Sequence, residues 1–431
     1  MWQGQLVSNI GTNIATVALM FWIKRVTGSA TLMGLSMMVY TFTYALATPI
    51  GGTLADRFSR KKILVISDSL AGIVSILLAT AMFIELKVWI LCVCIILAQF
   101  IYGCFQAFFY PTINASLPTL VPKKDLDKAN TAKNSAFQLG LLFGQGFGGG
   151  LFQIFGAPLI FLFNGISYLF SALSESFITI PVDYLKHKTK NQQSPLKQFR
   201  DDTKEGIQYL WKQKGVKNLV FMMGISYFFI GPFITLLPFF IEDILKLPPF
   251  WYGIIFGGFG FGAFVGFVLA SNIKVPGKIR SKIIYVTYLV YALVTGLFGF
   301  VGNGILATGI MVMGGLIVGY YTIAYETGIQ LRIPDHLRGR VFGAIGTVSA
   351  CLMPLGQFFS GIIADITDKN VSMIFLFSGI CLLITTFILL TKRSSLEVLE
   401  YDINDTSPKA KTEKDEASEQ DEEVPELVET Y

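Results

Sequence analysis

The chain has 431 residues, of which 53% are hydrophobic and only 15% are charged, with 38 phenylalanines among them. Soluble domains carry about 25% charged residues, so this composition excludes an ordinary water-soluble domain. The net charge of +5 combines a basic body with an acidic end. Residues 1–394 hold 31 Lys or Arg and 16 Asp or Glu, whereas residues 395–431 hold 3 and 13.

Twelve apolar stretches follow one another along the body of the chain. Each has about 20 residues or more, which is enough to cross the ~30 Å hydrocarbon layer of a bilayer. Because no water reaches the backbone at the bilayer centre, we expect each stretch to be a helix. The stretches cover residues 4–23, 32–55, 63–84, 88–110, 131–155, 158–180, 217–241, 250–272, 281–301, 303–327, 340–363 and 371–391.

The second half of the chain repeats the first. The run Gly-Gln-Gly-Phe-Gly-Gly at residues 144–149 returns as Gly-Gln-Phe-Phe-Ser-Gly at 356–361, an offset of 212. A further match, at an offset of 214, links residues 161–166 with 375–380. Matches in one order indicate two copies of a six-helix unit, an arrangement typical of transporters. We therefore predict an all-α membrane protein of two pseudo-symmetric six-helix bundles.

Positive charges gather in every second turn between the apolar stretches. If the N-terminus is cytoplasmic, the inner turns and the end of the last stretch carry 26 Lys or Arg, and the outer turns carry 5. The positive-inside rule then places both termini in the cytoplasm. The chain is expected to be a multi-pass protein of the cell membrane.

The chain divides into a first bundle at 1–181, a linker at 182–216, a second bundle at 217–392 and a tail at 393–431. The tail is acidic and poor in apolar residues, so we expect it to be disordered. The linker is expected to hold an amphipathic helix, which either lies on the inner membrane surface or is a solvated helix without lipid contact. Its apolar face gathers Leu196, Phe199, Thr203, Ile207, Leu210 and Trp211.

Several segments carry a family resemblance. Residues 51–62 read Gly-Gly-Thr-Leu-Ala-Asp-Arg-Phe-Ser-Arg-Lys-Lys. They resemble the signature loop of the major facilitator superfamily, with Ser59 where the family has Gly. Residues 140–149 resemble its antiporter signature, with Gln145 in place of Pro.

Three further segments, at 120–130, 205–211 and 333–341, are similar to the branch of drug:proton antiporters that contains macrolide-efflux pumps and the enterobactin exporter. The resemblance covers residues 4 to about 392. It implies a bacterial exporter with the major facilitator fold, working by alternating access and coupled to protons.

The signature loop supplies the first set of candidate functional residues. In the family, the loop carboxylate docks on the inner end of the eleventh helix, where a helix N-terminus carries about half a positive charge. Asp56 is thus expected to latch the two halves on the inner side and to favour the outward-open state. The alternative is a solvated turn. The latch residues are Gly52, Asp56, Arg57, Arg60, Lys61 and Arg340.

Glycines at every fourth position form a second set, because they leave one stripe of a helix without side chains and allow close backbone approach. The resemblance places both helices at the contact between the halves, where a smooth stripe lets the halves rock. Plain packing within one bundle is the alternative. The residues are Gly140, Gly144, Gly148 and Gly149 on one helix and Gly258, Gly262 and Gly266 on the other.

The family fold lines its central cavity with the first, fourth, seventh and tenth helices. In this chain those helices offer mainly aromatic and amide groups, which suit a bulky, lipophilic and weakly polar solute. Core packing or lipid contact is the alternative for each aromatic residue. The candidates for substrate binding are Asn9, Asn13, Gln99, Tyr102, Gln106, Tyr227, Phe228, Phe233, Tyr321 and Tyr325.

Carboxyl groups inside the apolar stretches are the candidates for proton coupling, because a charge in hydrocarbon is costly and usually functional. They are Glu326, Asp68 and Glu175, all in the cytoplasmic third. An apolar cavity favours the protonated form of a carboxyl group, so we hypothesise that Glu326 takes part in coupling and Asp68 in gating. Salt bridges at the inner gate are the alternative.

The residue inventory argues against catalysis. The two histidines, His187 and His336, have no metal-ligand spacing, and no phosphate-binding loop is present. We expect no cofactor, no metal, no nucleic-acid partner and no enzyme activity. The expected partners of this monomer are the bilayer, a lipophilic substrate and protons. The alternatives are a lipid or metabolite transporter without proton coupling, and a non-transporting sensor or scaffold on the same fold.

Overall fold

The computed structural model describes the backbone of residues 2–179, 195–273, 275–390 and 392–400. The linker before residue 195 and the tail after residue 400 lie outside the described residues, so the disorder expected of the tail stays a prediction. Within the described ranges, some side chains are left out: those of Trp2, Thr53, Asp56, Arg57, Lys123, residues 195–203, Asp335, His336, Ser349 and Leu390.

The first half of the chain forms an N-terminal bundle. A 3₁₀ turn, η1 (Lys123–Asp125), leads into its last long element. Ser29 starts the second helix as an N-cap, because its hydroxyl accepts a hydrogen bond from the Leu32 amide at 3.1 Å. The helices are α1 (Trp2–Thr27), α2 (Ala30–Arg57), α3 (Arg60–Phe83), α4 (Val88–Leu120) and α5 (Leu126–Ser176).

Element α5 is two helices joined at a sharp kink. Gly156 has φ 70° and ψ 169° there, a conformation that a residue with a side chain rarely adopts. Pro158 follows, at a position where its missing N–H costs nothing because a helix begins. The two predicted stretches 131–155 and 158–180 correspond to the two parts of this element.

The second half forms a C-terminal bundle. A π-helical turn, η3 (Phe240–Ile244), ends its first helix, and a 3₁₀ turn, η4 (Phe298–Phe300), ends its third. The helices are α7 (Lys214–Phe239), α8 (Phe250–Asn272), α9 (Gly277–Leu297), α10 (Gly304–Gln330), α11 (Asp335–Ile366), α12 (Val371–Leu390) and the short α13 (Arg393–Leu399). In α13, Val398 and Leu399 are buried, so the expected disorder does not begin at residue 393.

Among the described residues, eleven helical elements are long and apolar enough to cross a membrane. One of them is the 51-residue α5, which holds two helices. The predicted architecture of twelve membrane-spanning helices in two six-helix bundles is therefore confirmed.

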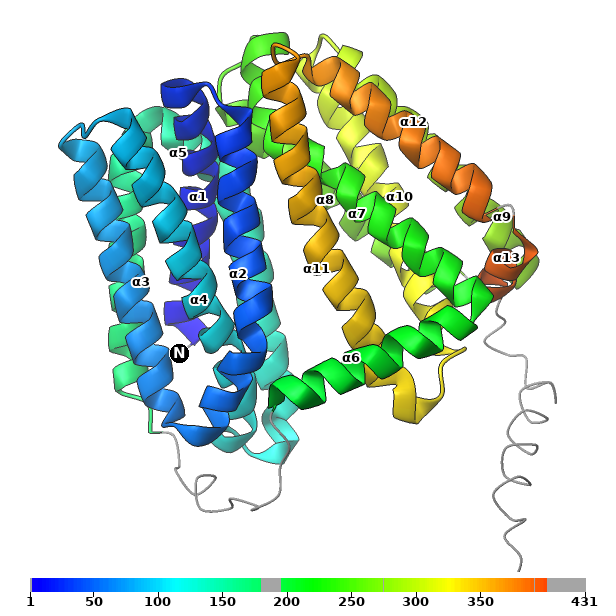
Figure 1. Cartoon of the computed structure of the whole chain (residues 1–431), viewed down its shortest axis with the longest axis horizontal. Helices are drawn as coiled ribbons and strands as arrows, with labels where there is room; N and C mark the ends of the chain where they lie inside the picture. The colour runs from blue at the N-terminus through cyan, green and yellow to red at the C-terminus, as the bar shows by residue number, and fades with distance from the viewer. Residues whose placement is uncertain (1, 180–194, 274, 391, 401–431) are drawn as a thin grey trace, which may run out of the picture.

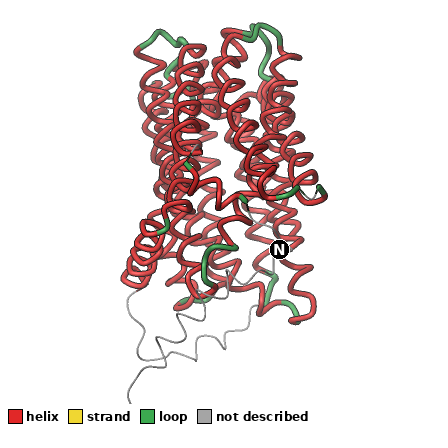
Figure 2. The backbone as a smooth tube through the Cα atoms, turned by 90° about the vertical axis from the view of Figure 1, so that its right-hand side faces the viewer, coloured by secondary structure: helices red, strands yellow, loops and turns green. Residues whose placement is uncertain are grey.

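The two bundles meet at one end and diverge toward the other (Figure 1). We call the end that carries the α2–α3 turn the inner end, following the charge prediction, and the opposite end the outer end. Turned by 90°, the long helices run between these two ends (Figure 2). Most of the contacts between the bundles are made by α2 with α11 and by α5 with α8, and we call these two contacts the crossings.

Both crossings bring backbone against backbone. A Cβ atom added at Gly361 of α11 would meet the carbonyl group of Ala30 at the start of α2. One added at Gly253 of α8 would meet the carbonyl group of Gly146 in α5. Gly146 and Gly361 belong to the two copies of the repeated glycine motif. The repeat therefore builds two equivalent crossings, one on each side of the pseudo-symmetry axis.

Helix α6 (Pro195–Lys212) bridges the two bundles at the inner end (Figure 1). It packs against α11, where Gly206 lies on the backbone of Arg340, and Leu210 is buried. Ile207 and Trp211 remain 41% and 60% exposed. The helix thus divides its apolar residues between protein contact and an exposed face, and contact of that face with the membrane surface stays a prediction.

Gly253→Val is expected to push the bundles apart at the outer end and to bring the inner ends closer, because any side chain at 253 overlaps Gly146. Gly257→Val is the matched control, since a Cβ there meets nothing within 4 Å. The measurement is the distance between spin labels at positions 58 and 331 in a cysteine-free background. Equal distance distributions in the two variants would contradict this account of the crossing.

Candidate functional site

An ionic network closes the outer end between the two bundles. Lys24 Nζ lies 2.9 Å from Glu242 Oε2 and 2.7 Å from Asp243 Oδ1. Arg25 Nη2 lies 2.9 Å from Glu242 Oε1. The side chains of Lys24 and Glu242 are only 10% and 16% exposed, so water screens this contact weakly. We call these four residues the outer gate.

The outer gate was not predicted from the sequence, although a signal for it is present. Lys24 and Arg25 end α1, while Glu242 and Asp243 lie in η3, which directly continues α7. In a duplicated chain α1 and α7 are equivalent helices. Opposite charge pairs at equivalent positions of two repeats indicate a contact across the pseudo-symmetry axis.

Asp365 joins the bundles at a second point of the outer end. Its carboxylate, near the end of α11, accepts hydrogen bonds from the Ser29 hydroxyl at 2.8 Å and from the amides of Ala30 and Thr31 at 3.0 and 2.9 Å. These amides are the free donors at the N-terminus of α2, where a negative charge is favoured. The residue acts as a cap supplied by the other bundle.

The latch residues lie at the diverged inner end. Arg60 is buried and donates hydrogen bonds to the carbonyl oxygens of Ala55 and Ala115, at 3.3 and 2.6 Å, which ties α2, α3 and α4 together. A Cβ at Gly52 would meet nothing within 4 Å. Lys61 is partly exposed at the start of α3, and the side chains of Asp56 and Arg57 lie outside the description.

Arg340, the latch residue on α11, has an ionic partner in α6. Its Nη1 lies 2.7 Å from Glu205 Oε1, and both side chains are about half exposed. Toward the inner end of α11, a Cβ at Gly339 or Gly343 would meet nothing within 4 Å. In this conformation the inner end of α11 is therefore held by the linker helix.

The glycine stripes pack within their own bundles. Gly140, Gly144 and Gly148 lie against Asn9, Asn13 and Val17 of α1. Gly258, Gly262 and Gly266 lie against Thr308, Val312 and Leu316 of α10. Gly149, next to the first stripe, instead faces Pro249 of the other bundle. One face of the glycine-rich first half of α5 thus packs on α1 within its own bundle, and the adjacent face contacts α8 of the other bundle.

The aromatic candidates for substrate binding fall into two groups. Tyr321 and Tyr325 are 8% and 2% exposed and belong to the core of the C-terminal bundle, where Tyr321 meets Tyr288 edge to face. Tyr102 stacks on Tyr168 with 6.5 Å between ring centres, and its hydroxyl has no hydrogen-bond partner among the described residues. The candidates that are partly exposed are Asn9, Asn13, Gln99, Tyr102, Gln106, Tyr227, Phe228 and Phe233.

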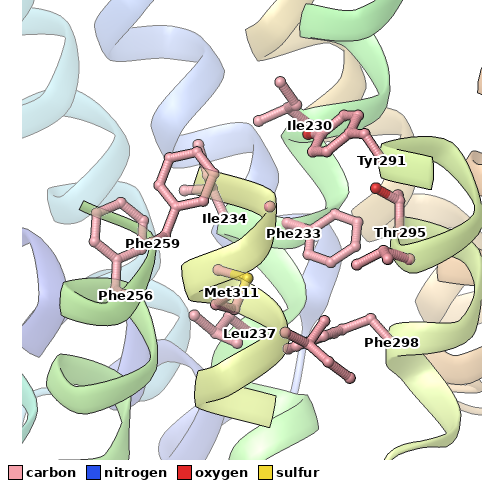
Figure 3. A pocket seen from close by; sticks show the side chains of 13 residues that line it. Ile230, Phe233, Ile234, Leu237, Phe256, Phe259, Tyr291, Thr295, Phe298 and Met311 are labelled. Atoms are coloured by element: carbon pink, nitrogen blue, oxygen red, sulfur yellow. The ribbon is translucent and has the colours of Figure 1, made fainter. Parts of the chain in front are cut away.

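A cavity lies inside the C-terminal bundle, between α7, α8, α9 and α10 (Figure 3). We call it the C-bundle cavity. It encloses about 660 Å³ of empty space, part of it open to the outside, and its lining is almost wholly apolar. It is lined by Ile230, Phe233, Ile234, Leu237, Phe256, Phe259, Tyr291, Val294, Thr295, Phe298, Ile310, Met311 and Gly314.

Of the substrate candidates from the sequence, Phe233 lines this cavity. Its ring stacks on Phe375 at 4.2 Å between centres, which fixes its position. In Figure 3, Phe256 and Phe259 face Tyr291 and Phe298 across the cavity. The contribution of α8 and α9 could not be read from the sequence, because it depends on how the bundle packs.

The three carboxyl groups proposed for coupling occupy two different environments. Asp68 and Glu175 are 4% and 1% exposed inside the N-terminal bundle. Glu326 is exposed and lies within electrostatic range of the phenols of Tyr227 and Tyr325 in the C-terminal bundle.

Two six-helix bundles, joined at one end by ionic contacts and diverging at the other, define a multi-pass membrane transporter. The chain belongs to the Major Facilitator Superfamily, whose family model matches residues 1–356.

Relatives and solved structures agree with this assignment. Macrolide efflux protein A of Streptococcus pyogenes is 26% identical over 380 residues, which cover 86% of this chain and 90% of the relative. The enterobactin exporter EntS of Shigella boydii is 22% identical over 349 residues, or 79% of this chain and 78% of the relative. A bacterial homologue of the human lysosomal transporter Spinster, in its inward-facing unoccupied conformation, superposes with a TM-score of 0.65 at 15% identity, over 92% of this chain and 95% of that one.

Glu242→Gln is expected to lower the population of the conformation with diverged inner ends, relative to the other conformations, by about tenfold. The substitution removes a charge from two half-buried contacts, and a hydrogen bond to a charged group contributes ~1.5–3 kcal/mol. The spin-label pair at positions 58 and 331 reports the shift. Glu85→Gln, an exposed outer-end carboxylate, is the control. Identical distance distributions for both variants would show that the outer gate does not hold this state.

Proposed function

We propose that the protein exports a lipophilic or amphiphilic small molecule by alternating access, in antiport with protons, with both termini in the cytoplasm. The C-bundle cavity is the single observation that carries the substrate class. Binding sites for drug-like ligands have mainly apolar and aromatic walls with a few polar groups, and the wall of this cavity has that composition. Thr295 and Tyr291 supply hydroxyl groups at its wall.

The names of the relatives support the direction and the class of substrate. Macrolides and enterobactin are large molecules with extended apolar or aromatic parts, and both named relatives move their substrates out of the cell. A macrolide is therefore the first probe for this chain. Aromatic walls favour such a solute because burying apolar surface stabilises its binding by ~25 cal/mol per Å².

Expression in an efflux-deficient bacterium is expected to raise resistance to lipophilic antibiotics, erythromycin first, and a protonophore is expected to abolish the effect. Gly314→Leu should weaken substrate binding by about tenfold or more, because a single methylene group more or less in an apolar pocket already changes binding by ~1–3 kcal/mol. A Cβ at Gly314 points toward the Tyr291 ring, 3.9 Å away, inside the cavity.

Gly309→Leu is the matched control on the same helix, since Gly309 is exposed and a Cβ there meets nothing within 4 Å. Resistance is measured as the minimum inhibitory concentration. Unchanged susceptibility to every compound would contradict the export of lipophilic drugs. Equal resistance with both leucine variants would exclude the C-bundle cavity as the binding site.

For the inner end, we propose that Arg340 exchanges partners during transport. It pairs with Glu205 of α6 while the inner ends diverge. When they close, Asp56 of the signature loop takes Glu205's place, which accounts for a carboxylate in this loop and an arginine at the start of α11.

Neutralising Asp56 and neutralising Glu205 are expected to shift the spin-label distance between positions 58 and 331 in opposite directions. Asp56→Asn should favour diverged inner ends and reduce drug export at normal expression. Glu205→Gln should favour closed inner ends, because it removes the carboxylate that pairs with Arg340 in the diverged state. Shifts in the same direction would contradict an exchange of partners.

A further inference from the structure

A buried polar group lies inside the N-terminal bundle, apart from the C-bundle cavity and from both gates. It combines Gln5 of α1, Asp68 of α3, and Ser171 and Glu175 from the second half of α5. These side chains are 5%, 4%, 0% and 1% exposed. Helix α5 packs against both α1 and α3, which brings the four residues together.

Most polar atoms of this group have no partner among the described residues. They include Asp68 Oδ2, both carboxyl oxygens of Glu175, the Gln5 amide nitrogen and Ser171 Oγ. Gln5 lies beside Glu175, and Ser171 lies beside Asp68, without completing a hydrogen bond of normal geometry. No described lysine or arginine side chain forms an ion pair with either acid.

Two carboxylates cannot both stay ionised in such a place. Removing one charge from water costs several kcal/mol even after relaxation, and two like charges repel each other strongly at low dielectric. Asp68 and Glu175 are close enough to act on each other electrostatically. The neutral form of at least one acid is favoured, and two acids that share a site take up and release protons as a unit.

The surroundings supply little compensating charge. The phenol of Tyr168 from α5 lies within electrostatic range of Asp68, and Tyr102 from α4 and Tyr40 from α2 lie within range of Tyr168. Phenols are neutral at physiological pH. From α1 the amide of Gln5 faces the pair. The positive charge that acts on Glu175 is that of the chain's amino terminus.

We propose that Asp68 and Glu175 form a proton-binding carboxyl pair whose loading and release couple the proton gradient to transport. This inference rests on the proposed proton antiport and names its site. A proton taken up from the outer side is held by one carboxyl oxygen of the pair. Its release to water at the inner end requires a movement that exposes the pair, because Glu175, one residue before the end of α5, is buried in this conformation.

The pair is connected to a helix that lines the central pathway in this family. Gly4 of α1 lies against the backbone of Ser171. The Thr12 hydroxyl of α1 donates a hydrogen bond to the Tyr168 hydroxyl at 2.9 Å. On its other side, α1 places Asn9 and Asn13 against the first half of α5. Ionisation of the pair requires water or a new hydrogen-bond donor beside the carboxylate. Helix α1 must move to make room for either.

The carboxyl pair differs from the candidate favoured by the sequence. Glu326 is exposed in the C-terminal bundle, so the protein does not enclose it in this conformation. Asp68 and Glu175 are enclosed by the N-terminal bundle in the same conformation. A group that is dry in one state and hydrated in another meets the requirement for coupling, because its protonation then depends on the state.

The pair can be tested on the purified full chain without any substrate, by infrared spectroscopy of the carboxylic-acid C=O stretch in nanodiscs. The wild type is expected to retain a protonated carboxylic acid at pH 7, where exposed Asp and Glu with ordinary values near ~4 are ionised. Asp68→Asn combined with Glu175→Gln should remove the band, and Glu85→Gln should keep it. Measuring protein with and without an N-terminal extension controls for the terminal charge.

A wild type without this band at pH 7 would overturn the proposal, and this result does not depend on the folding of a variant. Loss of the wild-type band on adding NaCl at constant pH would overturn it as well, because the site would then bind sodium rather than a proton.

Coupling is tested in proteoliposomes with radiolabelled erythromycin as the probe. Glu175→Gln is expected to lose the stimulation by a pH gradient while retaining exchange of labelled for unlabelled erythromycin, which also shows that the variant is folded. Stimulation equal to that of the wild type would overturn the coupling role. If the wild type does not move erythromycin, the export proposal fails for that probe, while the infrared result still decides whether the pair holds a proton.

Discussion

Close backbone contact between the bundles is the constraint on which the rest of the structure depends. At Gly253 and Gly361 the chain has no room for a Cβ atom, because a carbonyl group of the other bundle occupies that space. Helices in hydrocarbon gain little from burying apolar side chains against one another, so their association depends on close packing and on polar contacts. Close backbone approach at these glycines makes the contact tight, and it fixes where the bundles pivot.

Polar contacts at the two ends then select the state. The outer gate and the Asp365 cap join the bundles in this conformation, while the inner end of α11 is held through Arg340 and Glu205. Each contact consists of a few hydrogen-bonded charges, worth a few kcal/mol. Such contacts can be exchanged during a transport cycle, whereas the glycine crossings persist.

The bundles divide the chemistry between them. The C-terminal bundle offers an apolar cavity walled by aromatic rings, whereas the N-terminal bundle buries two acids beside unpaired polar groups. In the proposed mechanism one half recognises the solute and the other responds to protons. Helix α1 connects these roles, because it contacts the buried acids, carries Asn9 and Asn13, and ends at the outer gate.

The sequence by itself determined the twelve helices, the duplication and the family, since these follow from the length and apolarity of segments and from a motif repeated at one offset. It also placed glycines where helices come close. Only the tertiary structure decided which face of each helix meets which neighbour: that Gly140, Gly144 and Gly148 pack on α1, that Arg340 pairs with Glu205, and that Asp68 shares a site with Glu175 more than 100 residues away. Such pairings depend on helix rotation and crossing, and a helix that is apolar on all sides carries no periodic signal that fixes its rotation.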